Sequence, residues 1–286
     1  MTAAGAGGER EGRSAGEPTR LFLVGVSRAF GGAIFFALPL LMTMEMWWLG
    51  FYMDPFRLAL FLLLMLPMLV VLDRYSGFRE TATWLEDVVD GVTAYGVGFA
   101  AAAVILLLFH VIDLSMPLGE IVGKVSLQAI PASFGAVLAN SQLGGSDIDE
   151  EERRRATGYG GELFFMAVGA TFLAFNVAPT EEMVLIAFQM SSWHALALVG
   201  SSLVLMHAFV YAVDFRGGHG GVDEGGAWSL FLRFTLVGYA IALLLSGYIL
   251  WSFGRFEEAA LLVRVREVVV LAFPASLGAA AARLIL

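Results

Sequence analysis

The chain contains no cysteine, and charged residues make up only 15% of its 286 positions. The absence of cysteine excludes disulfides, thiol catalysis and cysteine metal sites. A soluble domain of this size would need far more charge to cover its surface. The sequence also lacks the segments His-Glu-x-x-His and Gly-x-Ser-x-Gly, and no similar catalytic constellation is present, so we do not expect an enzyme.

Long apolar runs dominate the sequence instead. Apolar residues make up 58% of the chain and the mean hydropathy is +0.78. Several runs approach or exceed the roughly 18–20 apolar residues that cross a hydrocarbon core. We therefore predict an all-α polytopic transmembrane protein that contacts the lipid bilayer and binds no nucleic acid. About eight spans can be drawn: Val26–Trp47, Pro55–Leu72, Gly91–Phe109, Gly119–Ala139, Gly161–Ala178, Trp193–Val213, Ser229–Phe253 and Arg266–Leu286.

One short motif occurs twice in the chain. Thr43-Met44-Glu45-Met46 recurs 137 residues later as Thr180-Glu181-Glu182-Met183. At the same offset, residues 32–53 share nine identities with residues 169–190 without a gap. Alanine and phenylalanine matches are common between apolar sequences, but a glutamate inside an apolar run is rare. The recurrence in register therefore indicates an internal duplication.

A second register extends the duplication to the end of the chain. Residues 122–143 match residues 265–286 at an offset of 143, with ten identities in 22 positions around a shared Pro-Ala-Ser core. Each repeat then has four spans, and an even number returns the chain to its starting side. We expect two tandem repeats, 19–143 and 161–286, in the same orientation and related by a pseudo-two-fold axis along the membrane normal.

Two polar segments flank the first repeat. Residues 1–18 are rich in Gly, Ala, Glu and Arg, and they lack the apolar middle of a signal peptide, which predicts a disordered cytoplasmic tail. Residues 144–160 carry both acidic and basic side chains. Their acidic residues lack the glycine and terminal glutamate of an EF-hand loop, so we interpret this segment as a solvated linker.

The paired carboxylates Glu45 and Glu182 are the leading candidates for a functional site. A carboxylate inside a span costs on the order of 2.5–3.5 kcal/mol, so it usually faces water or a partner. With Glu181, Thr43 and Thr180 they form the predicted ion-binding or selectivity group. We assign a metal such as calcium to Glu45 and Glu182 as a prediction, since hard oxygen ligands suit it. The structural alternative is that the glutamates cap helices or hydrogen-bond Trp and Thr at the outer interface.

Pro179 stands directly before the second copy of the motif, and an acidic first turn follows it. The fifth span is therefore expected to break at Pro179 and to restart as a short outer segment that runs to Met190. The matching segment 43–53 lacks that proline. The sequence leaves open whether these segments continue their spans, lie on the membrane surface or re-enter the membrane.

The helices around Pro131 and Pro274 are rich in small residues, which let membrane helices approach closely. Helix packing is one interpretation of this composition. In the other, Ser133 and Ser276 line a central pathway. Asn176 is a further polar residue at membrane depth and a possible lining residue.

The whole chain resembles a family of bacterial integral membrane proteins known as a domain of unknown function with a duplicated Thr-x-Glu-Met motif. The segments that carry the resemblance are Thr43–Met53, Asn176–Met183 and Arg283–Leu286. The resemblance implies a membrane protein and transfers no established activity.

The function that follows from the repeat is cation transport, with a channel favoured over a carrier. Two carboxylates from one chain, or four from a homodimer, could form a ring of the kind that selects cations. We expect inorganic cations as partners, a homo-oligomer with a dimer favoured, and no cofactor apart from a bound calcium or other cation. The alternative is a non-conducting scaffold or an accessory subunit of another membrane complex.

The distribution of basic residues predicts the orientation. With the N-terminus inside, twelve of the 17 Arg and Lys residues fall on the inner side and five outside. Since inner loops carry the excess of positive charge, we expect both termini to be cytoplasmic in a multi-pass protein of the cell's inner membrane.

A cysteine introduced at Ser146 tests this orientation cleanly, because the chain has no cysteine of its own. We expect an impermeant thiol reagent to leave it unlabelled in intact cells and to label it once the membrane is opened. Labelling from outside intact cells would reverse the topology.

Overall fold

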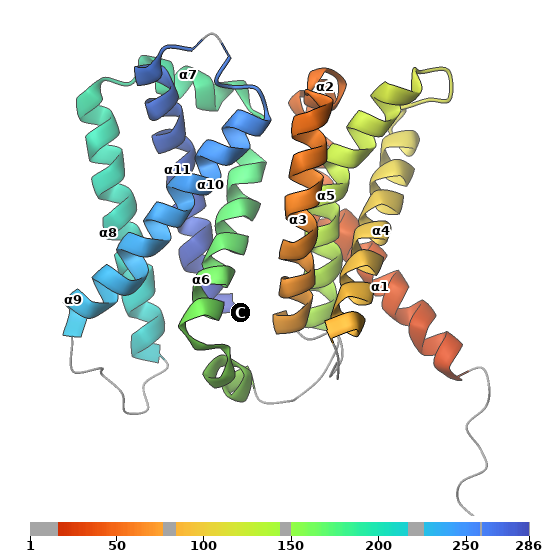
Figure 1. Cartoon of the computed structure of the whole chain (residues 1–286), viewed down its shortest axis with the longest axis horizontal. Coiled ribbons are helices and arrows are strands. Elements are labelled where there is room, and N and C mark those ends of the chain that lie inside the picture. The colour runs from red at the N-terminus through yellow and green to blue at the C-terminus, as the bar shows by residue number, and fades with distance from the viewer. Residues whose placement is uncertain (1–16, 77–83, 144–149, 217–225, 258, 286) are drawn as a thin grey trace, which may run out of the picture.

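The computed structural model describes residues 17–76, 84–143, 150–216, 226–257 and 259–285 as a bundle of long helices (Figure 1). The first half of the chain forms α1 (Glu17–Leu41), α2 (Met44–Tyr52), α3 (Pro55–Ser76), α4 (Trp84–Leu108) and α5 (Leu118–Leu143). The second half forms α6 (Glu150–Val177), α7 (Glu181–Gln189), α8 (Ser192–Arg216), α9 (Gly226–Leu230), the π-helical turn η1 (Phe231–Leu236), α10 (Val237–Ser252) and α11 (Leu261–Ile285).

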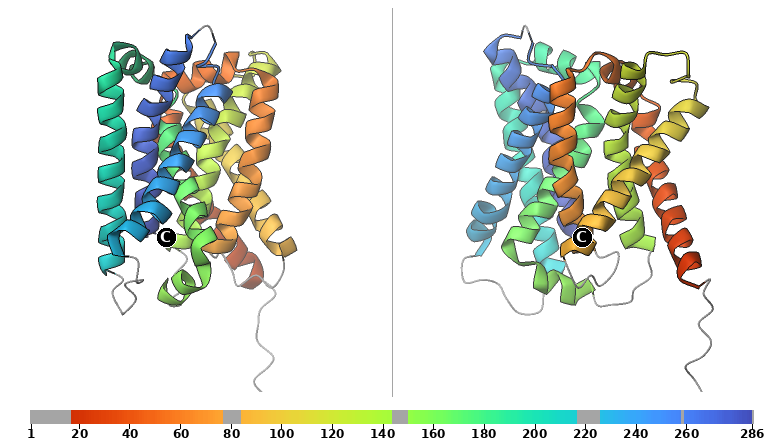
Figure 2. Two further views of the ribbon diagram at one scale, coloured as in Figure 1. Left: turned by 60° about the vertical axis from the view of Figure 1, so that its left-hand side comes forward. Right: turned by 45° about the vertical axis from the view of Figure 1, so that its right-hand side comes forward.

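The helix bounds follow the two registers of the sequence. The short helices α2 and α7 have nine residues each and begin at positions 44 and 181, which are 137 apart. Helices α3 and α8 begin at positions 55 and 192, at the same separation. Helices α5 and α11 begin at positions 118 and 261, which are 143 apart. Both halves run in the same direction, with α1 and α6 rising to the end where α2 and α7 lie (Figures 1 and 2).

Seven helices in the described chain are long and apolar enough to cross a membrane, against the eight spans expected. Helix α11, which contains the expected eighth span, is not among them and carries Arg264, Arg266 and Glu267 near its start. The first span is also shorter than predicted. It ends at Leu41 rather than Trp47, and the chain turns at Thr43 before α2 begins.

The two polar segments differ in part from the prediction. Residues 1–16 of the expected tail lie outside the described residues, while Glu17 and Pro18 already belong to α1. Most of the expected linker 144–160 is helical, because α6 begins at Glu150 and bends at Gly158, whose φ of 58° is left-handed.

Helices α5 and α11 form the centre of the two halves. Helix α5 packs against α1, α2, α3 and α4, and α11 packs against α6, α7, α8 and α10. Glycines set the closest approach in both halves. A Cβ added at Gly32 would lie 2.7 Å from the Gly135 carbonyl oxygen, and one added at Gly169 would lie 2.1 Å from the Gly278 carbonyl oxygen. These positions are equivalent in the two registers, so both halves use the same close backbone crossing.

The two halves meet along α3, which packs against α6 and α10. Phe61 of α3 stacks on Phe175 with 5.5 Å between ring centroids, and Phe253 packs edge-on against both rings. At the outer end, Arg57 forms a 2.8 Å ion pair with Glu257 and lies over the Trp251 ring. This interface gives the halves their relative placement.

The predicted two-fold relation between the halves is wrong. Such an axis would place α3 and its counterpart α8 in equivalent positions at the interface. Instead α3 lies between the halves, whereas α8 lies at the far edge of the molecule (Figure 1). Burial agrees, since 33% of the α3 span is buried against 17% of the α8 span. The halves are therefore arranged head to tail.

The glycine crossing can be tested with two neighbouring residues. In Gly32→Ala the new methyl group would lie 2.0 Å from the Ala139 Cβ, whereas a Cβ at Gly31 meets nothing within 4 Å. We expect Gly32→Ala to lower stability by about 1–3 kcal/mol because the helices must separate. Gly31→Ala should be neutral or slightly stabilising, because alanine favours helix. Thermal unfolding of the two purified variants measures this, and equal midpoints would contradict the close crossing.

Candidate functional site

Helices α2 and α7 lie at the same end of the molecule, and each carries one copy of the duplicated motif (Figure 1). Each follows a break in the chain, since α1 ends at Leu41 and α6 ends at Val177. The expected break at Pro179 is confirmed, and the first half breaks at the same place without a proline. The shared determinant is therefore the motif itself rather than the proline.

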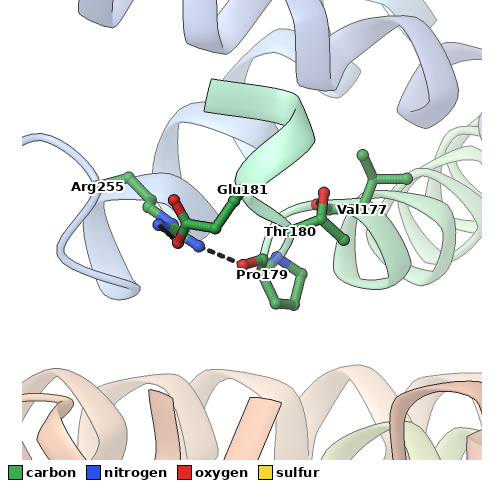
Figure 3. A network of polar contacts seen from close by, with 5 residues as sticks. All are labelled: Val177, Pro179, Thr180, Glu181 and Arg255. Carbon is green, nitrogen blue, oxygen red and sulfur yellow. Dashed lines mark hydrogen bonds and ion pairs between the residues drawn. The ribbon is translucent and has the colours of Figure 1, made fainter. Parts of the chain in front are cut away.

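The two threonines of the motif stabilise these breaks. The Thr43 hydroxyl donates to the Pro39 carbonyl at 2.6 Å, and the Thr180 hydroxyl donates to the Val177 carbonyl at 2.8 Å (Figure 3). Both carbonyls lie in the last turn of the preceding helix, where intrahelical donors run out, and the Val177 carbonyl also accepts the Thr180 backbone N–H at 3.0 Å. Neither threonine side chain caps the helix that follows. The threonines thus act as backbone partners, which is a structural role.

The remaining carbonyls at the two breaks find different donors. In the first half, the Trp47 indole N–H donates to the Leu41 carbonyl at 2.8 Å, and the buried Gln128 amide donates to the Leu40 carbonyl at 2.9 Å. In the second half, Arg255 donates to the Pro179 carbonyl (Figure 3). The sequence did not single out Arg255 for this role, because Arg255 belongs to the α10–α11 turn, 76 residues from Pro179.

Arg255 also binds the first carboxylate of the second motif. Its guanidinium lies 3.0 Å from a Glu181 carboxylate oxygen. The arginine side chain is 13% exposed and that of Glu181 is 70% exposed, so solvent screens this pair. Glu181 is thereby engaged with the protein, which weakens its predicted role as an ion ligand.

The two register-matched glutamates differ from Glu181. Glu45 is half-buried in the first turn of α2, and Glu182 is exposed in the first turn of α7. Neither carboxylate has a hydrogen bond or an ion pair within the described residues. They belong to different halves, and no cluster of three or more acidic or histidine side chains that could hold a metal is found in those residues. A calcium site built on Glu45 and Glu182 therefore stays a prediction.

The three possible pathway residues all bind their own helices. Asn176 donates to the Phe172 carbonyl at 2.7 Å, Ser133 to the Ala129 carbonyl at 2.6 Å and Ser276 to the Phe273 carbonyl at 2.8 Å. Both serines are fully buried beside the prolines of α5 and α11. These contacts favour the helix-packing interpretation of the serines.

Buried charge on the two central helices is a feature that the sequence reasoning missed. Lys124 of α5 is 8% exposed and Glu267 of α11 is 2% exposed, and the two positions match at the offset of 143. Lys124 forms a 2.5 Å pair with Glu120. Within the part of the chain that the structure describes, one oxygen of Glu267 has no hydrogen-bond partner, although Arg255 and Arg264 lie near enough to attract its charge. The sequence signal for this feature was a charged residue at matching positions of two apolar helices.

Asp113 adds a further carboxylate at the same end, in the turn between α4 and α5. The pKa of Asp113 is lowered because the hydroxyl and the backbone N–H of Ser115 both donate to its carboxylate. It therefore stays ionised in mild acid. As an exposed charge held by its own turn, it offers a matched control for the motif glutamates.

The architecture and composition define a polytopic helical integral membrane protein. Residues 25–286 match the family model described as "Putative integral membrane protein (DUF2391)", so the chain belongs to that family. The match covers all of the described helices from α2 onward and most of α1. No curated protein and no solved structure matches the chain.

The Arg255 contacts predict unequal effects of two substitutions. Arg255→Gln removes the donor of the buried Pro179 carbonyl, so we expect a loss of about 1–3 kcal/mol in stability. Glu181→Gln removes only a screened ion pair, which is worth about 0.2–1 kcal/mol. Thermal unfolding of the single and double variants measures both, and Arg264→Gln, which leaves α7 untouched, is the control. Equal losses from Arg255→Gln and Glu181→Gln would show that the carbonyl contact contributes nothing.

Proposed function

We propose that the protein transports inorganic cations across the membrane, as a channel rather than a carrier, with Glu45 and Glu182 attracting the ion. One observation carries the proposal. At matching positions of two matching short helices, the chain keeps a carboxylate that forms no hydrogen bond or ion pair within the described residues.

The structural alternative accounts for less of the site. In that alternative the glutamates cap helices or hydrogen-bond Trp and Thr at the outer interface. The contacts found there are different, because Trp47, Thr43 and Thr180 all donate to backbone carbonyls. The first-turn position of each glutamate does favour its helix, by about 0.3–1 kcal/mol through the helix dipole. Aspartate would supply the same dipole effect as glutamate. The effect therefore does not explain why both copies hold glutamate at the same position.

The number of carboxylate oxygens in one chain limits how a cation could be bound. Calcium takes 6–8 oxygen ligands, and two carboxylates supply at most four oxygens. A cation at this site would therefore keep part of its water shell or bind carboxylates from more than one copy. Both conditions suit a site that attracts and passes an ion rather than one that retains it.

The proposal includes a particular arrangement in the membrane. The two halves are tandem repeats of four spans with α11 as the eighth, they face the same way, and both termini lie in the cytoplasm of a cell whose inner membrane holds the protein. The matching helix bounds and the shared glycine crossing support the duplication. We propose transport rather than catalysis.

The second candidate is a non-conducting scaffold or accessory subunit. It is favoured by the long helix α8, of whose span only 17% is buried, since such a helix offers a large surface to a membrane partner. In that function the duplication would serve stability alone, and neutralising the motif glutamates would change no ion flux.

Neutralising the glutamates separates the two candidates. We expect Glu45→Gln and Glu182→Gln, in purified protein in liposomes, each to lower divalent over monovalent selectivity. Residues in one charged cluster couple by about 0.5–3 kcal/mol, so the double variant should differ from the product of the single effects by about two- to a hundredfold.

The control for this measurement is Asp113→Asn, which removes a carboxylate from the same end of the molecule and should leave selectivity unchanged. Flux is normalised to folded protein, because Glu45 and Glu182 also favour their helices. Unaltered selectivity in a folded double variant with measurable flux would end the proposal that these carboxylates select the ion.

A further inference from the structure

The contact between the halves uses two different surfaces. The α3 face, formed by Arg57 and Phe61 with Phe36 at the end of α1, belongs to the first half. The α6–α10 face, formed by Phe172, Phe175, Trp251, Phe253 and Glu257, belongs to the second half and its α10–α11 turn. An interface between unlike faces is heterologous, so one copy of each face is left over unless further halves close a ring.

Each half also carries the counterpart of the face that it does not use. By the offset of 137, the counterpart of the α3 face in the second half is the α8 face, with His194 and Leu198 in place of Arg57 and Phe61. The counterpart of the α6–α10 face in the first half is the α1–α4 face. It is formed by Phe35 and Leu38 at the offset of 137 and, because α4 and α10 end 144 residues apart, by Leu107, Phe109 and Asp113. The two counterpart faces lie on opposite edges of the molecule, α8 at one and α1 with α4 at the other (Figures 1 and 2).

These counterpart faces are largely open in the single chain. Phe35 is 74% exposed, Leu107 is 51% exposed and Phe109 is 43% exposed, and His194 is also exposed, while Leu198 is half-buried against the core. Phe61, the counterpart of Leu198, is fully buried in the contact between the halves. The chain thus repeats both surfaces of an existing interface and uses only one copy of each.

We propose that a second copy of this chain docks its α1–α4 face onto the α8 face, repeating between chains the contact that α3 makes within one chain. Applied in both directions, the contact joins two copies into a closed ring of four halves. The ring would bring two copies each of Glu45 and Glu182 around one axis. This inference rests on the duplication in the proposed function and names the partner that completes its carboxylate ring.

The contact between copies differs in chemistry from the contact within the chain. Positions of the Arg57–Glu257 ion pair become His194 and Asp113, and the stacked rings of Phe61 and Phe175 become Leu198 and Leu38. Asp113 is already engaged by Ser115 of its own turn, so the interface between copies depends on apolar packing. Such packing is weak against lipid, so the dimer should separate in detergent more readily than the halves of one chain.

Paired cysteines with a short bifunctional maleimide test the contact in native membranes, because the chain has no cysteine of its own. His194→Cys/Asp113→Cys should give a cross-linked dimer, and Leu198→Cys/Leu38→Cys should do the same at membrane depth. Arg57→Cys/Glu257→Cys should link within one chain without a change in mass, which shows that the chemistry works. His194→Cys/Phe56→Cys is the negative control. Phe56 is 71% exposed, but it lies beside the α3 face, which the contact within the chain already occupies.

The head-to-tail geometry predicts a second result, for the single cysteine variants. His194→Cys alone and Asp113→Cys alone should not form dimers, whereas co-expression of the two single variants should yield the cross-linked pair. Dimers from either single variant would overturn the heterologous contact. A ladder beyond the dimer would overturn closure by two copies, and a monomer in both double variants, with efficient in-chain linking in the control, would show that α8 faces lipid alone.

Cross-linking is read without any transport measurement, so the two proposals fail separately. A cross-linked dimer with no cation flux keeps the interface and removes the transport function. Monomers together with altered selectivity in the glutamate variants keep the transport function and remove this interface.

Discussion

Hydrogen bonding of the backbone where spanning helices break is the constraint on which this structure depends. Water is scarce at these depths, so a carbonyl released at the end of a helix must meet a donor from the protein. The chain meets this demand twice with a threonine that donates back into the preceding helix. It then adds Trp47 and Gln128 in the first half and Arg255 in the second. These donors determine where α2 and α7 lie.

The placement of the breaks has a functional consequence. Threonine and its neighbours donate hydrogen bonds to the backbone carbonyls at the breaks, so the adjacent glutamates have no role in that hydrogen bonding. Glu181 is held by Arg255, whereas Glu45 and Glu182 have no partner among the described residues. The duplicated motif therefore pairs a structural residue, the threonine, with a glutamate that its surroundings do not engage. In the proposed function, conformational stability and ion attraction belong to two positions only two residues apart.

Local features of the fold could be predicted from the sequence. The registers of 137 and 143 gave the matching positions of α2 with α7 and of α5 with α11, and Pro179 marked the second break. The helical start of the segment at Glu150 was missed, because its charge resembled a solvated linker. The relative placement of the halves was also missed. It depends on contacts such as Phe61 with Phe175 and Arg57 with Glu257, and a repeat pattern says nothing about which faces meet. The role of Arg255 could not be predicted for the same reason, since its partners lie far away in the sequence.

Cation transport is the central functional claim, and flux through the unaltered protein tests it most directly. Purified protein in liposomes would be exposed in turn to gradients of sodium, potassium, calcium and protons, beside protein-free liposomes. We predict flux of at least one of these cations above the protein-free rate and dependent on the amount of protein. Rates equal to those of protein-free liposomes for all four, with the protein folded and inserted, would contradict cation transport and leave the scaffold function in its place.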